Sequence, residues 1–309
     1  VASKYGLDSD NWLLAQGTLY PDIIESGGTK NAQVIKTHHN RVAGIQELIA
    51  KGLIIEPLKD LYKDEVRIIG KRLGLPDALV MRHPFPGPGL SINVLCSDGM
   101  MSEKDKSDFK NAEKEIEAMS IPLSQTVMNR YALPVRSVGV QGDFRTYRFP
   151  AVLSFETLAD GFYRTPEDWD ALEAASSYIT NKASFINRTL IRLYRKPGVT
   201  LALQKGYCDK GRLDRLREAD DIALEALYES GWYDKVFQHL TIDLPYASSP
   251  DRASFVLRPV CSEDVMTARF AHLPQDVLER IVQKIAALPF VDAVYYDATN
   301  KPPATFGWE

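Results

Sequence analysis

Three prolines within eight residues constrain this chain more than any other feature. The segment HPFPGPGL, from His83 to Leu90, cannot form a helix or a central strand, because each proline fixes φ and removes a backbone donor. We therefore predict a rigid, extended turn and place a domain boundary there. Residues 1–90 then form one domain and residues 91–309 a second, with possible subunits 91–155 and 156–309. A chain of 309 residues is long enough to bury a core in each domain.

The first 90 residues read as the later part of an α/β domain. Trp12 to Gln16 is predicted as a short buried strand, so we expect the earlier elements of this domain to lie upstream of the sequence. A polar loop is expected over residues 20–40. Apolar spacing then predicts helices over residues 42–51 and 60–73, with a stop at Gly74 and a short helix from Pro76.

The remaining residues read as an α+β domain. Strands are predicted over residues 90–96, 133–141, 146–155, 236–244, 255–261 and 293–297, and helices over residues 103–119, 166–194, 212–230 and 275–288. The tight Gly142-Asp143 turn joins the second and third strands into a hairpin. Thr165 is expected to cap the long helix that starts at Pro166, with Asp168 as the capping-box acid.

A weak internal repeat accompanies these elements. At a shift of 121 positions, five residues recur: Val135, Asp143, Thr146, Arg148 and Phe149 meet Val256, Asp264, Thr267, Arg269 and Phe270. Two readings stay open, coincidence or two related copies of a small sheet-plus-helix unit.

Composition excludes several classes of protein. The net charge of −4 gives no general attraction to nucleic acid or to an anionic membrane, so an anionic ligand has to be held by individual cations. No apolar run approaches the roughly 20 residues needed to span a bilayer. The three cysteines are far apart and odd in number, which predicts neither a disulfide framework nor a CxxC metal site and favours the cytoplasm.

The run SGGTK, from Ser26 to Lys30, is the first candidate for binding a nucleotide phosphate. A phosphate cradle follows a buried strand and opens a helix, so that backbone N–H groups converge on the anion. This run lies in the polar loop and has no apolar helix behind it. We therefore expect that the ATP phosphate loop is absent from this sequence.

The cluster containing Lys36, His38 and His39 ends the same loop. Adjacent histidines point to different sides of a regular element, which argues against one shared metal ion. Two readings stay open: partly exposed loop residues, or the donor-rich end of a lid that closes over substrate. Asp22 and Glu25 are either partners of such a lid or solvated charges.

Cations also flank two later turns. Arg82 and His83 precede the proline-rich segment, whose rigidity suits a binding site and equally a domain hinge. Arg145 follows the hairpin turn and can hold a phosphate bidentately, whereas Asp143 suits the turn itself.

The C-terminal tail is the least ordinary segment. Lys301 precedes Pro302-Pro303, and the chain ends in Trp308-Glu309. A lysine beside a rigid turn is a plausible phosphate ligand. A hydrophobic tether would also explain the stiff prolines and the tryptophan.

Seven stretches, in this order along the chain, resemble the GMP synthetase family. They are AQGTLYPDIIES, IKTHHN, IEPLKDLYKDEVRIIGKRLGLP, RHPFPGPGL, VGVQGDFRTY, SEDVMTA and KPPAT. Several are long and unusual, so the resemblance is specific and runs through almost the whole chain. About a hundred residues, roughly 154–254, separate stretches that are contiguous in the short bacterial form. The chain is therefore similar to the family's long form, which has a doubled dimerisation unit.

The resemblance implies an ATP-pyrophosphatase remnant followed by a dimerisation domain that forms a homodimer. The family makes GMP from XMP, ATP and glutamine-derived ammonia: ATP, with Mg²⁺, adenylates XMP, and ammonia then displaces AMP. The glutaminase domain and the ATP loop would lie upstream, so the fragment alone is expected to be inactive. The implied catalytic lid contains Asp22, Glu25, Lys36, His38 and His39. The implied XMP ligands are Arg82, His83, Asp143, Arg145, Lys301, Thr305 and Glu309.

Three positions depart from the family pattern: Asn93 replaces an arginine, Gly307 a glutamate, and Glu218 a glutamine. Their effect on XMP affinity stays open. Two other readings also stay open. One is a non-catalytic nucleotide-binding and dimerisation module. The other is a different ATP-pyrophosphatase amidotransferase, such as a tRNA-modifying enzyme, against which the acidic balance argues.

Overall fold

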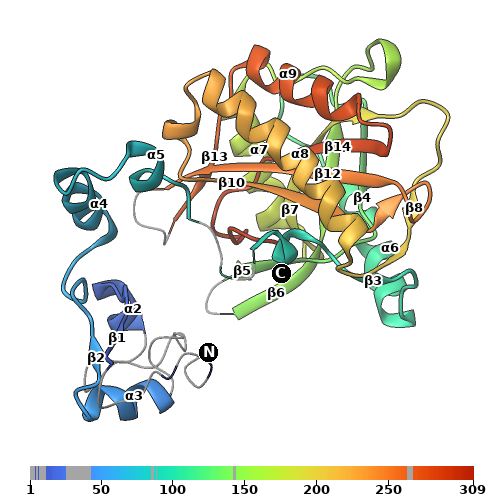
Figure 1. Ribbon diagram of the computed structural model, residues 1–309. Coiled ribbons are helices and arrows are strands. Elements are labelled where there is room, and N and C mark those ends of the chain that lie inside the picture. Colours follow the sequence, from blue (N-terminus) through green and yellow to red (C-terminus); the bar gives the residue numbers. More distant parts are fainter. Residues whose placement is uncertain are drawn as a thin grey trace. The chain divides into compact units, whose positions relative to one another are not determined.

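The chain separates into two compact units, residues 1–82 and 83–309. The computed structural model describes residues 4, 6, 12–25, 43–84, 87, 89–141, 144–262 and 267–309. Figure 1 gives the element labels.

The first unit combines short helices with one small parallel pair of strands. Strand β1 (Leu14–Ala15) pairs with β2 (Ile54–Ile55), and the helices are α2 (Tyr20–Glu25), α3 (Ala43–Ala50), α4 (Lys63–Arg72) and α5 (Asp77–Val80). The three helices predicted after residue 40 are confirmed, and Gly74 adopts the positive φ of +79° that ends α4. Two expectations were wrong. The strand near Trp12 is exposed, with Trp12 58% accessible, and α2 occupies the start of the expected loop.

The second unit is built on one twisted sheet. Among the described residues this sheet has eight strands, six of them in the order β10-β12-β14-β7-β6-β4. The strands are β4 (Asn129–Ala132), β5 (Ser137–Gln141), β6 (Phe144–Ser154), β7 (Ile186–Arg195), β10 (Gln238–Leu244), β12 (Ala253–Cys261), β13 (Arg269–Phe270) and β14 (Val291–Asp297). The helices are α6 (Glu103–Ala118), α7 (Trp169–Lys182), α8 (Lys210–Glu229) and α9 (Gln275–Ala286). Short pairs β3 (Ser97–Asp98) with β9 (Lys205–Gly206) and β8 (Ala202–Leu203) with β11 (Tyr246–Ala247) lie outside it.

The sheet consists of two halves with the same topology. In one half β6 and β7 are parallel neighbours connected by α7, and β4 pairs antiparallel with the other edge of β6. In the other half β12 and β14 are parallel neighbours connected through α9, and β10 pairs antiparallel with the other edge of β12. The halves meet where β14 pairs antiparallel with β7. Helix α6 precedes the first half and α8 the second.

This correspondence differs from the one expected from the sequence. The helices α6 and α8 begin at residues 103 and 210, a separation of 107, and β7 and β14 begin at residues 186 and 291, a separation of 105. The shift of 121 positions would instead align β6 with β13. The halves of the sheet therefore cover residues 103–195 and 210–297, and the subunits 91–155 and 156–309 stay a prediction.

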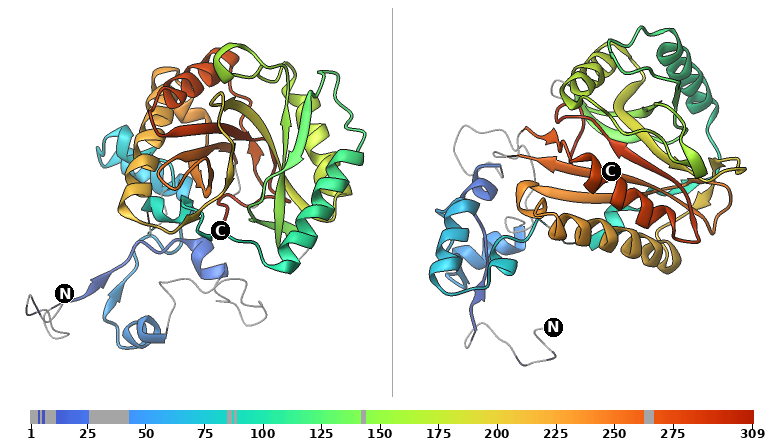
Figure 2. Two further views of the ribbon diagram at one scale, coloured as in Figure 1. Left: turned by 90° about the vertical axis from the view of Figure 1, so that its right-hand side faces the viewer. Right: turned by 90° about the horizontal axis from the view of Figure 1, so that it is seen from above.

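Each face of the sheet carries its own core. One face packs against α6, α7, α8 and α9, in a cluster that includes Ile116, Ile179, Leu216 and Ile281. Figure 1 shows α8 and α9 lying across β10, β12 and β14, and Figure 2 shows α6 and α7 beside the other half. The second face packs against Trp308 of the C-terminal tail. Because side chains alternate along a strand, successive residues of the central strands point to the two faces in turn.

Two predicted elements of the second unit were wrong. The expected strand over residues 90–96 begins instead with a 3-10 helix, Gly89–Asn93, whose first residue has a positive φ of +70°. The expected helix over residues 166–194 divides into α7 and the central strand β7, and its cap is Asp168, which accepts from Ala171 N at 2.9 Å. The remaining helices, the hairpin strands and the strands after residue 235 are confirmed.

Candidate functional site

The hairpin and the C-terminal tail form one continuous structure. Strands β5 and β6 pair antiparallel, with Val140 opposite Arg145. The other edge of β5 receives the tail: Val140 N donates to Pro303 O at 2.7 Å, and Val138 N donates to Trp308 O at 2.9 Å. Two segments more than 150 positions apart, both predicted to bind XMP, are thus adjacent.

Gly139 permits this approach. A Cβ at this position would lie 2.8 Å from Pro303 O, 2.8 Å from Thr146 Oγ1 and 2.9 Å from Asn187 Nδ2. Contacts below 3.0 Å to a backbone oxygen require the tail to move. Glycine is therefore the residue that lets the tail lie against β5.

A buried ionic cluster lies beneath the tail. The Asp297 carboxylate oxygen Oδ2 is 2.8 Å from Arg188 Nη1 and 2.9 Å from Arg258 Nη1, and all three side chains are completely buried. Trp308 Nε1 donates to the same oxygen at 3.0 Å. Burial lowers the pKa of Arg188 to about 9, against the opposing effect of Asp297, so Arg188 stays charged at neutral pH. Burial also lowers the pKa of Arg258.

The two guanidinium groups hold the tail by its carbonyl groups. Arg188 Nη2 donates to Gly307 O at 2.7 Å and to Val138 O at 2.9 Å, joining the tail to β5. Arg258 donates to Phe306 O at 2.9 Å and to Thr305 O at 2.8 Å. The cluster therefore fixes the backbone of residues 305–307 in one conformation.

Lys301 begins the tail in a defined backbone position. Its N–H donates to Ala268 O at 2.7 Å, and its carbonyl accepts from Ala268 N at 3.0 Å. Its ammonium nitrogen lies 4.6 Å from the centroid of the Phe306 ring, a cation–π distance. The tail thus folds back so that Phe306 supports the lysine.

The other predicted XMP ligands on the hairpin and the tail lie in three different surroundings. Arg145 is exposed on β6. The Thr305 hydroxyl lies 3.0 Å from Arg188 Nη2, 3.1 Å from Val138 O and 2.6 Å from Gly307 O, so it helps to join the tail to β5 and β7. Glu309 lines a cavity of about 250 Å³ together with Arg136, beyond the end of the tail that pairs with Val138. Lys301 and Glu309 are therefore at opposite ends of the tail.

Two residues predicted beside the proline-rich turn have different surroundings. His83 stacks on Tyr233 with centroids 3.8 Å apart, and its Nε2 is 2.8 Å from Tyr233 O. These contacts suit a structural role for His83. Arg82 is exposed at the end of the first unit.

Most of the predicted lid lies outside the described residues: Lys36, His38, His39 and the side chain of Glu25. The predicted XMP ligand Asp143 also lies outside them. Asp22 accepts a hydrogen bond from Leu19 N at 2.9 Å, at the start of α2. A carboxylate that binds a backbone N–H at a helix start contributes to helix stability. The catalytic role of this group stays a prediction.

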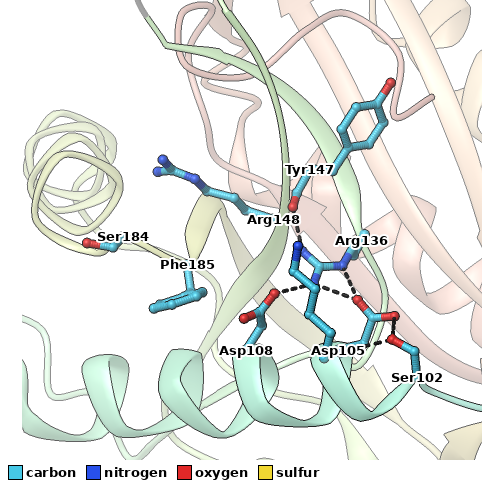
Figure 3. Close-up of a pocket in the computed structure, with 9 residues that line it drawn as sticks. Ser102, Asp105, Asp108, Arg136, Tyr147, Arg148, Ser184 and Phe185 are labelled. Atoms are coloured by element: carbon cyan, nitrogen blue, oxygen red, sulfur yellow. Dashed lines mark hydrogen bonds and ion pairs between the residues drawn. The ribbon is translucent and has the colours of Figure 1, made fainter.

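A cavity of about 500 Å³ lies between α6 and β6 (Figure 3). Arg136 points at α6, where it contacts Asp105 at 2.6 Å and Asp108 at 2.8 Å, and it donates to the carbonyl of Tyr147 at 2.6 Å. Two carboxylates therefore already compensate this cation, and Arg136 ties the hairpin to α6.

Sequence reasoning missed the three residues that anchor the tail. Arg188 was assigned to a helix, and neither Arg258 nor Asp297 was singled out. The only signal available was an arginine or aspartate at an apolar position of a predicted strand, as in FVLRPV and VYYDA. A buried charge of this kind needs a partner, and no local pattern shows which residue that is.

No helix in the described part of the chain combines the length and apolar character needed to cross a membrane. The same residues contain one group of potential metal ligands, Asp170, Glu173 and His272, whose donor atoms lie within 4.8 Å of one another. Arg269 is 2.5 Å from Glu173 and 3.7 Å from Asp170, so a guanidinium already compensates these carboxylates.

Comparison with known proteins places the tail in a recognised domain. Residues 225–308 match the family described as GMP synthase C terminal domain. A probable glutamine-hydrolysing GMP synthase of Leptospira interrogans is 40% identical over 98% of the chain and 48% of its own length. The corresponding protein of Caenorhabditis elegans is 32% identical over 100% of the chain and 50% of its own length. A GMP synthase of Symbiobacterium thermophilum is 43% identical over 61% of the chain and 37% of its own length.

The matched domain lies within the second unit and contains its α9, β14 and C-terminal tail. The chain spans about half the length of the Leptospira and Caenorhabditis relatives. It belongs to the GMP synthetase family and corresponds to its C-terminal part.

Proposed function

We propose that this chain binds XMP and supplies the nucleotide-accepting part of an enzyme that converts XMP to GMP. The observation that carries the proposal is the junction of the β5–β6 hairpin with the tail, through the Val140–Pro303 hydrogen bond of 2.7 Å. It brings the elements bearing Arg145 and Lys301 together. Both segments carry the motifs on which the family resemblance rests.

In this proposal Lys301 and Arg145 bind the phosphate of XMP. A dianionic phosphate is held best by cations whose positions are fixed before it arrives, because less entropy is lost on binding. Residues 305–307 are fixed by Arg188 and Arg258. Asp143 and Glu309 would contact other parts of the nucleotide. Asp22, Glu25, Lys36, His38 and His39 would close over the reacting atoms as a lid.

ATP and Mg²⁺ complete the reaction in the parent enzyme that we propose. ATP would convert the C2 oxygen of XMP into a leaving group, and ammonia from a glutaminase domain would displace it. Among the described residues, the one group of three potential metal ligands does not suit a Mg²⁺ ion, since Arg269 compensates its carboxylates. We therefore propose that the ATP and Mg²⁺ site lies mostly outside this sequence, and that the chain acts in the cytoplasm as a homodimer joined through the second unit.

Titration of the chain with XMP tests the proposal. We expect Lys301→Ala and Arg145→Ala each to weaken binding about 10- to 100-fold, because a hydrogen bond to a charged group contributes about 1.5–3 kcal/mol. Isothermal titration calorimetry measures the affinity. Lys210→Ala, which removes a surface lysine paired with Asp214, is the matched control and should bind like the parent chain. An absence of XMP binding by the parent chain, or full affinity in both variants, would overturn the proposal.

The chain alone is expected to make no GMP from XMP, ATP and ammonia. The proposed function places the ATP-binding loop outside this sequence, so nothing here would activate XMP for displacement. The measurement is AMP and GMP formation by the purified chain, with a full-length family member as positive control. Steady turnover by the purified chain would contradict this prediction.

A further inference from the structure

Glu173 joins α7 to both segments that hold Lys301. Arg269, on β13, donates to its carboxylate through Nε at 3.1 and 3.2 Å and through Nη2 at 2.5 Å. Asn300, the residue before Lys301, donates to the same carboxylate through Nδ2 at 2.8 Å. The side chain of Glu173 is only 20% exposed. One carboxylate therefore bridges three elements.

The two segments that Glu173 bridges are already paired through Lys301. Ala268 and Lys301 exchange two backbone hydrogen bonds, at 2.7 and 3.0 Å. Asn300 Oδ1 also accepts from Phe270 N at 3.2 Å. Arg269 and Asn300 thus flank the Ala268–Lys301 pair, one on each segment, and both bind Glu173. Movement of the carboxylate would release both sides of the pair.

Donors surround both carboxylate oxygens of Glu173. Oε1 accepts from Asn300 Nδ2 and Arg269 Nε, Oε2 accepts from Arg269 Nη2 and Nε, and His272 Nε2 lies 3.3 Å from Oε2. Burial raises the pKa of Glu173, but the hydrogen bonds from Arg269 and Asn300 outweigh this and hold the pKa below its usual range. A glutamine would have to turn its NH₂ group towards one of these donors. Glu173→Gln therefore removes the charge and one arm of the bridge with almost no change in side-chain volume.

We propose that Glu173 is a positioning residue for Lys301, fixing its backbone so that the ammonium group meets the phosphate of XMP. This inference rests on the proposed function. Glu173 does not touch the nucleotide; it acts through Asn300 and Arg269. If Glu173 positions Lys301, then its substitution should weaken only the contact between Lys301 and the phosphate of XMP. The nucleoside part of XMP should not depend on Glu173.

The test compares XMP with xanthosine, which lacks the phosphate. Parent chain, Glu173→Gln and the control Glu225→Gln are titrated with both ligands by calorimetry. Glu225 forms a surface ion pair of 3.0 Å with Lys284, so its substitution removes the same charge from an exposed helix face. We expect Glu173→Gln to lower the affinity for XMP about 5- to 20-fold, since about 1–2 kcal/mol of the charge-assisted contact between Lys301 and the phosphate is lost. The affinity for xanthosine should change less than about twofold.

The outcomes separate this inference from the proposed function. Failure of the parent chain to bind XMP, or undiminished binding by Lys301→Ala, overturns the proposed function and this inference with it. If Lys301→Ala binds XMP weakly but Glu173→Gln binds it as tightly as the parent chain does, only the positioning role is overturned. An equal loss for XMP and xanthosine shows a general structural defect and also overturns it. Circular dichroism melting checks that each variant folds, and Asn300→Ala, which cuts the same bridge at its other end, replaces Glu173→Gln if that variant does not.

Discussion

Replacing Asp297 by alanine is expected to lower the free energy of unfolding by about 3–5 kcal/mol. The substitution leaves Arg188 and Arg258 buried without the carboxylate that they share. Desolvated charges are stable only when a partner and hydrogen bonds compensate them. Trp308 Nε1 also loses its acceptor. The tail should detach from β5, so XMP affinity should fall together with stability.

Urea unfolding followed by circular dichroism measures this loss. Asp214→Ala is the matched control, because Asp214 also pairs with two cations, Lys210 and Arg217, but on the exposed face of α8. Exposed ion pairs contribute about 0–1 kcal/mol, so the control should remain close to the parent chain. If Asp297→Ala lost no more than the control, the buried cluster would not be what holds the tail.

Gly161→Ala is expected to cost about 3 kcal/mol of unfolding free energy. Gly161 has a φ of +86°, where an L-residue is strained by about 1–2 kcal/mol. A Cβ at this position would also lie only 2.1 Å from Arg195 O, at the end of the central strand β7. To relieve this contact, the turn or the strand end would have to move. Overpacking of this kind adds about 1–3 kcal/mol to the loss.

The matched control for Gly161 is Gly198→Ala. Gly198 has a similar φ of +74°, but its Cβ would meet no atom within 4 Å. This variant should therefore show the backbone strain alone, about 1–2 kcal/mol. Denaturation of both variants in urea isolates the contribution of the clash. Equal losses in the two variants would show that Arg195 O moves away without cost.

Local patterns predicted most elements of the second unit. The helix α9 was recognisable because its apolar residues Val277, Leu278, Ile281 and Ile285 repeat at helical spacing and are all buried. Strand β7 was mistaken for helix because Arg188 and Arg192 resemble the polar face of an amphipathic helix. In the structure both arginines are buried. Burial between β6 and β14 overrides the local pattern, and a sequence window does not contain these neighbouring strands.

The sequence by itself determined the family, through motifs that recur in order, and the type of most elements, through periodicities within a few turns of chain. It also singled out Arg145 and Lys301 as candidate phosphate ligands. Only the tertiary structure decided that the hairpin and the tail lie side by side, and that Arg188 and Asp297, 109 positions apart, form the pair beneath them. The physical reason is that a buried ion pair forms only when the fold removes both partners from water. Its partners are therefore chosen by the packing of the sheet and not by their spacing along the chain.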